Sequence, residues 1–281
     1  MTSRQRAKQR SGQRASRADR LWSWVAGILV LGAIVLGFRA ISQGRPTAEA
    51  DLRAVFIDQL SPQYPNETFR LTVTDSLESF GLAVEVSEGE DVDVELYRSL
   101  PLKRPGVVLI RSHSGILVLE GEEKEHITAL FTNEPYSEMS HVAEQLDERL
   151  LIVRAFEDEG ELSFGISPEF IDESMSGRLP RSIVIIAGCS CLGRTDLAEA
   201  FVARGASVVV SWDGSVTLDH VDAATALLVD RFFRDGLTLE NAVIATMLEY
   251  GEDPDFGALM TYFPVAAGRY TAAQLLGQSR R

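Results

Sequence analysis

Short apolar runs alternate with longer amphipathic stretches along most of the chain, a pattern that predicts parallel strands joined by helices. Three of the runs have almost no polar position, which is typical of strands buried on both faces of a sheet. The predicted strands are 54–58, 82–86, 106–112, 182–188 and 207–212. The predicted helices are 65–79, 92–99, 137–149, 197–204, 218–234 and 238–250. We therefore expect an α/β fold with three layers, in which helices cover both faces of a mostly parallel sheet.

Three further strands are predicted outside this parallel set. Residues 116–120 and 128–132 have the pattern of an antiparallel hairpin, and 163–166 that of an edge strand before a helix at Pro168. Gly205 is expected to end the helix that precedes it, because glycine adopts the left-handed conformation common after helix C-termini.

The first fifty residues carry a membrane signal. Residues 21–38 are 18 consecutive residues without a charge, which as a helix span about 27 Å, close to the roughly 30 Å hydrocarbon core of a bilayer. Residues 1–20 hold seven Lys or Arg and one acidic residue, so the positive-inside rule places them in the cytoplasm. The predicted parts are a basic cytoplasmic tail (1–20), a transmembrane signal anchor in the lipid bilayer (21–43), a linker (44–52) and an extracytoplasmic α/β domain (53–281).

A cleaved signal peptide is the alternative for the same segment. Ala48-Glu49-Ala50 fits the small-x-small pattern of a cleavage site. This site lies some ten residues beyond the apolar run, and the run is longer than the 7–15 residues usual in a signal peptide. We therefore expect a single-pass protein of the cell membrane.

Composition and charge limit the classes of function. The chain of 281 residues is 45% hydrophobic and 24% charged, which excludes a disordered, collagen-like or coiled-coil protein. Its two cysteines exclude a disulfide-stapled scaffold. From Gly44 onward there are 19 basic and 40 acidic residues, and so acidic a domain repels phosphate backbones. We expect no nucleic-acid partner.

Candidate chemistry lies at the carboxyl ends of the predicted strands, where open parallel sheets gather their ligands. His113 follows strand 106–112 and Cys189 follows strand 182–188. A thiolate is a nucleophile, and a nearby imidazole can take its proton or stabilise it as an ion pair. Ser114 and Gly115 leave room for a substrate backbone, and the amides around Gly115 or after Cys189 are candidate donors to an oxyanion.

Three more residues lie at or directly after strand ends. Asp58 and Asp213 are predicted to form a pocket for a cationic substrate side chain, and Trp212 is predicted to be a pocket wall or a core residue. The alternative for Asp213 is turn chemistry, because Asp-Gly is a common turn dipeptide. No metal site and no cofactor are predicted, since neither zinc-ligand spacing nor a phosphate-binding glycine loop is present in the sequence.

His-Ser-Gly after one apolar strand and Ile-Ile-Ala-Gly-Cys after a later one resemble the caspase–gingipain–legumain clan of cysteine peptidases. The resemblance covers roughly residues 51–252 and also extends to single-pass membrane proteins of prokaryotes that carry such a domain. It implies a caspase-like domain with flavodoxin-like strand order, and a peptide or protein substrate. It further implies that Cys189 is the nucleophile and His113 the base or ion-pair partner.

Two questions stay open at this point. Cys189 is either an activated nucleophile, an inert buried thiol, or half of a tight disulfide with Cys191. The domain is correspondingly either a membrane-anchored cysteine peptidase-like hydrolase or a catalytically silent caspase-like binding module at the cell surface.

Overall fold

A mixed, mostly parallel sheet of six strands forms the centre of the computed structural model, which describes residues 52–119, 125–155 and 160–278. The strand order is β10-β9-β8-β3-β1-β2, and only β10 is antiparallel to its neighbour. The strands are β1 (Arg53–Asp58), β2 (Ala83–Glu88), β3 (Val107–Arg111), β8 (Ile183–Ala187), β9 (Val208–Trp212) and β10 (Met260–Phe263). The five predicted parallel strands are confirmed, and β10 is an addition to them.

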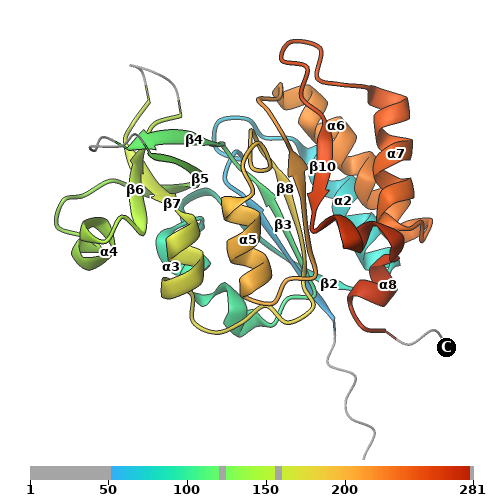
Figure 1. Cartoon of the computed structure of the whole chain (residues 1–281), viewed down its shortest axis with the longest axis horizontal. Helices are drawn as coiled ribbons and strands as arrows, with labels where there is room; N and C mark the ends of the chain where they lie inside the picture. Colours follow the sequence, from blue (N-terminus) through green and yellow to red (C-terminus); the bar gives the residue numbers. More distant parts are fainter. Residues whose placement is uncertain (1–51, 120–124, 156–159, 279–281) are drawn as a thin grey trace, which may run out of the picture. The chain divides into compact units, whose positions relative to one another are not determined.

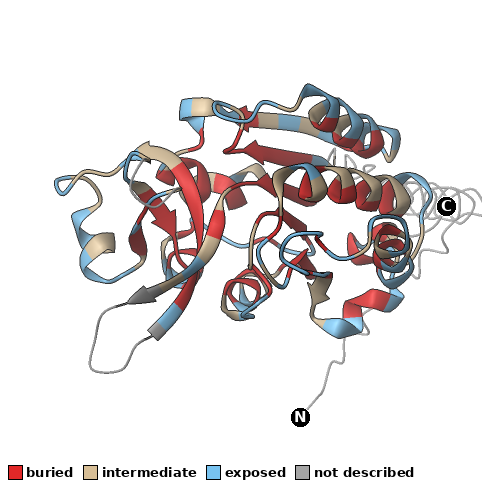
Figure 2. Cartoon of the chain, turned by 90° about the horizontal axis from the view of Figure 1, so that it is seen from above, coloured by how far each residue is buried: buried red, intermediate tan, exposed pale blue. Residues whose placement is uncertain are grey.

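Helices cover both faces of this sheet, as the sequence predicts (Figure 1). One face packs against α2 (Glu67–Ser79), α6 (Leu218–Val229), α7 (Leu239–Tyr250) and α8 (Ala272–Leu275). The other packs against α3 (Val94–Ser99), α5 (Asp196–Ala203) and a π-helical turn, Phe170–Ser174. Every residue of β3, β8 and β9 is buried, which explains why their sequences are almost entirely apolar (Figure 2).

A smaller antiparallel sheet follows β3 in the chain. Its order is β4-β5-β7-β6, formed by β4 (Ser114–Leu119), β5 (Glu125–Pro135), β6 (Leu150–Val153) and β7 (Ser163–Ile166). The predicted hairpin is confirmed, with Ile116 opposite Thr128. The prediction that 163–166 is an edge strand is wrong, because β7 lies between β5 and β6. The unpredicted strand β6 takes the edge position instead.

The helix predicted over 137–149 is also wrong in extent. Only α4 (Val142–Leu146) forms there, since His141 and Glu148 on either side of it have positive φ angles of 50° and 56°. A residue in the left-handed region interrupts a right-handed helix. In addition, α4 has no buried residue, so it lacks the packing that extends amphipathic helices.

The longer helices begin and end at residues of the types expected at helix termini. Asn66 caps α2 by accepting a 3.0 Å hydrogen bond from the Phe69 amide, and Thr238 caps α7 by accepting from Asn241. Gly205 follows α5 with a φ of +111°, as expected of a residue that ends a helix. The predicted helix 218–234 continues past α6 as a π-helical turn, Asp230–Arg234.

The predicted tail, membrane anchor and nearly all of the linker lie outside the described residues. Within residues 52–119, 125–155 and 160–278, none of the helices combines the length and apolarity needed to span a bilayer. The segment from Asp51 onward forms a unit of its own, separate from Met1–Ala50.

Candidate functional site

The strand register brings His113 and Cys189 to equivalent positions. β3 and β8 are adjacent parallel strands in which Arg111 pairs with Ala187. His113 and Cys189 each lie two residues beyond this pair, and adjacent strands are about 4.8 Å apart. Both residues line one cavity of about 430 Å³ at the carboxyl edge of the sheet.

Hydrogen bonds hold the two loops against each other. The hydroxyl of Ser114 donates to the carbonyl of Cys189 at 2.8 Å, and the amide of Ser112 donates to the carbonyl of Ala187 at 3.2 Å. A Cβ on Gly188 would lie 2.5 Å from the Ser114 Oγ and 2.6 Å from the Ser112 carbonyl oxygen. The loops can approach this closely because residue 188 has no side chain.

His113 is half-buried, and both its main-chain amide and its main-chain carbonyl form hydrogen bonds. Its amide donates to the side-chain oxygen of Gln59 at 2.9 Å, and its carbonyl accepts from the Phe131 amide at 3.0 Å. The imidazole packs edge-on against Tyr64, with ring centroids 6.2 Å apart. Burial and the nearby Arg111 cation both lower the pKa of His113, which favours the neutral imidazole that a general base requires.

The thiol of Cys189 is also half-buried. Its Sγ is 3.6 Å from the carbonyl oxygen of Val216, to which the S–H donates a weak hydrogen bond. Burial raises the pKa of Cys189, and the carboxylate of Asp253 adds to the rise, against the opposing effect of the Val216 contact. Both shifts favour a neutral thiol and a neutral imidazole, so the sulfur would have to lose its proton before it could act as a nucleophile.

The second cysteine has a different environment. Ser190, between the two cysteines, has a φ of +55°, and Cys191 is fully buried in the core on the α3 and α5 face. Burial raises the pKa of Cys191 to about 12. Cys189 instead packs against the core on the α6 face. Both cysteines are free thiols, so the structure does not contain the Cys189–Cys191 disulfide left open by the sequence.

The two predicted specificity acids have partners within the protein. Asp58 is buried and forms a 2.9 Å ion pair with Arg111. Asp213 accepts a 2.7 Å hydrogen bond from the amide of Leu259. Neither acid is among the described residues that line the cavity with His113 and Cys189.

Trp212 and Gly115 also lie outside this lining. Trp212 is fully buried, and its ring packs against His220 at 5.2 Å, so of its two predicted roles it takes that of a core residue. Gly115 lies in the edge strand β4, where a Cβ would meet nothing within 4 Å. Ser114, by contrast, lines the cavity.

A buried ionic cluster lies next to the site, at the end of β3, and it is not predicted by the sequence. Arg111, only 1% exposed, pairs with Asp58 and makes two hydrogen bonds to Asp222, at 2.7 and 2.8 Å. It also donates to the carbonyl of Tyr64 at 2.9 Å. The available signal was an arginine at the end of an otherwise apolar strand, because a buried charge requires partners. Burial raises the pKa of Asp58, and the Arg111 cation opposes the rise.

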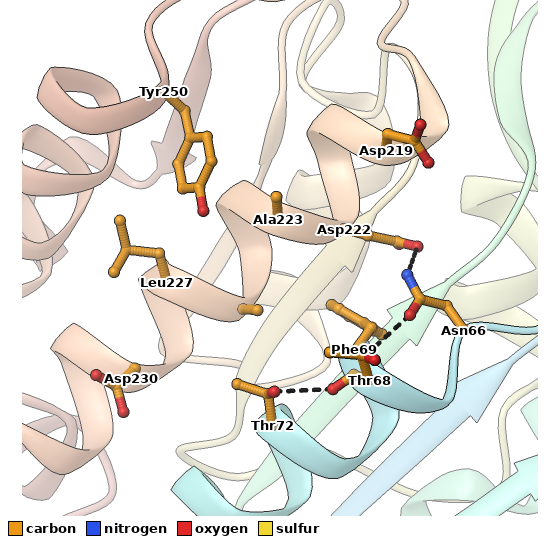
Figure 3. A pocket seen from close by; sticks show the side chains of 11 residues that line it. Asn66, Thr68, Phe69, Thr72, Asp219, Asp222, Ala223, Leu227, Asp230 and Tyr250 are labelled. Carbon is orange, nitrogen blue, oxygen red and sulfur yellow. Dashed lines mark hydrogen bonds between the residues drawn. The ribbon is translucent and has the colours of Figure 1, made fainter.

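A second cavity of about 430 Å³ is lined by residues of α2 and α6, among them Asp222 (Figure 3). Asp222 accepts a 2.8 Å hydrogen bond from Asn66 at its edge. The described residues of this lining include Asp219, Asp230 and Tyr250 but no thiol and no imidazole. The candidate chemistry therefore stays with the cavity that holds Cys189.

The rest of the first cavity is largely apolar. Its lining beyond His113, Ser114 and Cys189 includes Leu60, Tyr64, Val216, Leu218, Val221 and Phe256. These residues come from the loops after β1 and β9, from α6 and from the loop between α7 and β10, so no local sequence pattern points to them. Across the described parts of the chain, no group of three or more His, Cys, Asp or Glu residues is placed to hold a metal ion. Comparison of the sequence with protein-family models finds no match, and comparison with curated proteins finds none either.

Proposed function

We propose that this chain is a caspase-like cysteine hydrolase that cleaves peptide bonds, with Cys189 as nucleophile and His113 as general base. The observation that carries the proposal is the shared cavity of these two residues, each two positions beyond a paired residue of adjacent central strands. The strand order β2-β1-β3-β8-β9 and the antiparallel insertion directly after His113 fit the resemblance to the caspase–gingipain–legumain clan.

The proposed reaction begins when His113 takes the proton of the Cys189 thiol. The sulfur forms a bond to the substrate carbonyl carbon, and the carbonyl electron pair moves onto oxygen. The C–N bond then breaks while His113 returns the proton to the leaving amine, which leaves a thioester. Water, deprotonated by His113, attacks the thioester and releases the acid, and the proton returns to Cys189.

The oxyanion needs donors near the sulfur. The amide of Ser190 already donates to the carbonyl of Gly214 at 2.8 Å, so it is occupied. The amides around Gly115 are the remaining proposed donors, because an edge strand such as β4 directs half of its amides away from its neighbour. Such donors stabilise the transition state more than the substrate.

A catalytically silent binding module is the second candidate. The observation that favours it is the raised pKa of Cys189 beside the lowered pKa of His113, since an inert pair also consists of a neutral thiol and a neutral imidazole. In either case we propose that residues 21–43 anchor the domain at the outer face of the cytoplasmic membrane, with residues 1–20 inside.

The test uses the full chain in detergent with a mixed-sequence peptide library, and mass spectrometry identifies cleaved products. We expect cleavage by the wild type and by the matched control Cys191→Ala, but not by Cys189→Ala. His113→Ala should lower the rate by about 100-fold or more. Undiminished cleavage by Cys189→Ala would refute the nucleophile. Absence of any cleavage by the wild type, together with an unreactive Cys189, would favour the silent module.

A further inference from the structure

The cavity beside Cys189 has an apolar floor and an aromatic rim. Leu60, Val216 and Val221 are 4%, 7% and 3% exposed and form the buried part. Tyr64 and Phe256 are 36% and 61% exposed and lie where the cavity opens to solvent. A side chain that enters next to the reacting sulfur therefore meets carbon atoms on several sides.

No carboxylate and no cationic side chain occurs among the described residues of this lining. The buried charges of the cluster near His113 pair with one another, because Arg111 binds both Asp58 and Asp222. A charged substrate side chain would thus lose hydration without gaining a counter-ion.

Asp253 is a further carboxylate near the sulfur of Cys189, and both of its oxygens accept hydrogen bonds from the protein. It is 1% exposed and accepts hydrogen bonds from the Thr217 amide (2.7 Å), the Thr217 hydroxyl (2.9 Å), the Asp255 amide (3.0 Å) and the Phe256 amide (2.9 Å). These bonds join the turn after β9 to the loop that carries Phe256. Asp253 therefore holds in place the loop that carries Phe256, and it is not free to bind a cationic side chain.

We propose that this cavity is a specificity pocket for an uncharged, apolar side chain of leucine or phenylalanine size, on the residue whose carbonyl Cys189 attacks. The inference rests on the proposed function and names the substrate class of the same site. It replaces the cationic substrate expected from Asp58 and Asp213, since Arg111 and the Leu259 amide already bind those carboxylates.

The test measures side-chain preference by covalent labelling, so it does not depend on turnover. Four N-blocked dipeptidyl chloromethyl ketones, ending in leucine, phenylalanine, aspartate or lysine, react with the full chain in detergent at pH 8. In each reaction the sulfur displaces chloride, forming a thioether, and the thiol proton is released. Mass spectrometry of the Cys189 peptide gives the rate for each probe.

We expect the leucine and phenylalanine probes to label Cys189 at least 10-fold faster than the aspartate and lysine probes. Equal rates, or faster labelling by a charged probe, would overturn the apolar pocket while leaving the proposed nucleophile in place. Failure of all four probes to label Cys189 would instead overturn the proposed function, and the pocket with it.

Variants of one loop give a matched comparison. Phe256→Ala removes an exposed rim side chain and should reduce the preference for the leucine probe over the lysine probe by about 5-fold or more. Leu259→Ala removes an apolar side chain that is 46% exposed and lies outside the described cavity lining, so the preference should not change. An unchanged preference in Phe256→Ala, with the protein folded, would count against the pocket.

Discussion

The hydroxyl of Ser114 donates a 2.8 Å hydrogen bond to the carbonyl of Cys189 and thereby joins the start of β4, directly after His113, to the loop after β8. Because β3 and β8 are parallel neighbours, their loops leave the sheet side by side. Without a cross-link, two such loops could diverge, and the imidazole and the sulfur would separate. The hydroxyl one residue after His113 therefore helps to position both candidate catalytic groups.

Replacing Ser114 by alanine should loosen this arrangement without unfolding the domain. The change leaves the Cys189 carbonyl without its donor, at a cost of about 1 kcal/mol in the free energy of unfolding. We expect the rate of peptide cleavage to fall several-fold because the dyad is less well held. Ser99→Ala also removes a hydroxyl that donates to a main-chain carbonyl, but in α3, and should leave the cleavage rate unchanged. A cleavage rate in Ser114→Ala equal to that of the wild type would show that the hydrogen bond from Ser114 to Cys189 does not position the catalytic groups.

Gly188→Ala should be more damaging, because its Cβ meets a backbone atom. The new carbon would lie 2.6 Å from the Ser112 carbonyl oxygen, which can move only if the loop moves. We expect a loss of roughly 1–3 kcal/mol of unfolding free energy in urea titration, and loss of cleavage. The control is Gly106→Ala, whose Cβ would lie 3.2 Å from the movable side chains of Leu52 and Leu276. Equal stability of the two variants would contradict the predicted crowding at residue 188.

The sequence predicts the parallel sheet well because a strand that is buried on both faces is a short run of apolar residues, which can be recognised locally. β3, β8 and β9 are almost entirely apolar, and the expectation of a site at their carboxyl ends follows from a general rule of such sheets. Four-residue strands contain little periodicity, so β6 and β10 are not predicted although the equally short β7 is.

The Arg111 cluster and the walls of the cavity are not predictable from the sequence for a different reason. Arg111 lies 53 residues from Asp58 and 111 residues from Asp222, so no window of sequence shows that they pair. The same holds for the cavity walls, since Tyr64 and Phe256 reach Cys189 only after the sheet has formed. Hence Asp58, which lies at the carboxyl end of a strand as a specificity acid would, pairs with a buried arginine.

Removing the charge of Arg111 should destabilise the domain strongly. Arg111→Met leaves two buried carboxylates without their cation, and breaking a buried pair in this way costs roughly 3–5 kcal/mol. The triple variant Arg111→Met/Asp58→Asn/Asp222→Asn removes the uncompensated charges and should recover part of the loss. Urea unfolding of the three proteins measures this. A single variant as stable as the wild type would show that the cluster is not a structural support.

Asp58 should make the stability of the domain depend on pH. Its pKa in the folded protein is raised above the ordinary value of 3.8 by burial, so the folded state holds the proton more tightly than the unfolded state. The contribution of Asp58 is thus fully present below about pH 3.8 and is lost as the pH rises through the raised value. The difference in unfolding free energy between wild type and Asp58→Asn, measured from pH 3.5 to 7, should therefore shift in favour of Asp58→Asn as the pH rises. A difference that does not change with pH would contradict the raised pKa.

The thiol chemistry of Cys189 should also follow its environment. Because burial raises the pKa of Cys189, little thiolate exists at neutral pH, and alkylation by iodoacetamide should be slower than that of a free cysteine peptide at pH 7. The rate should keep rising with pH beyond the point at which the peptide levels off, and Cys191, fully buried, should react only on unfolding. Mass spectrometry of the two cysteine peptides in the full chain separates the two sites. A rate that is already constant between pH 6 and 7 would mean that His113 holds Cys189 as a preformed thiolate–imidazolium pair. In that case the sulfur would attack without the proton transfer proposed above.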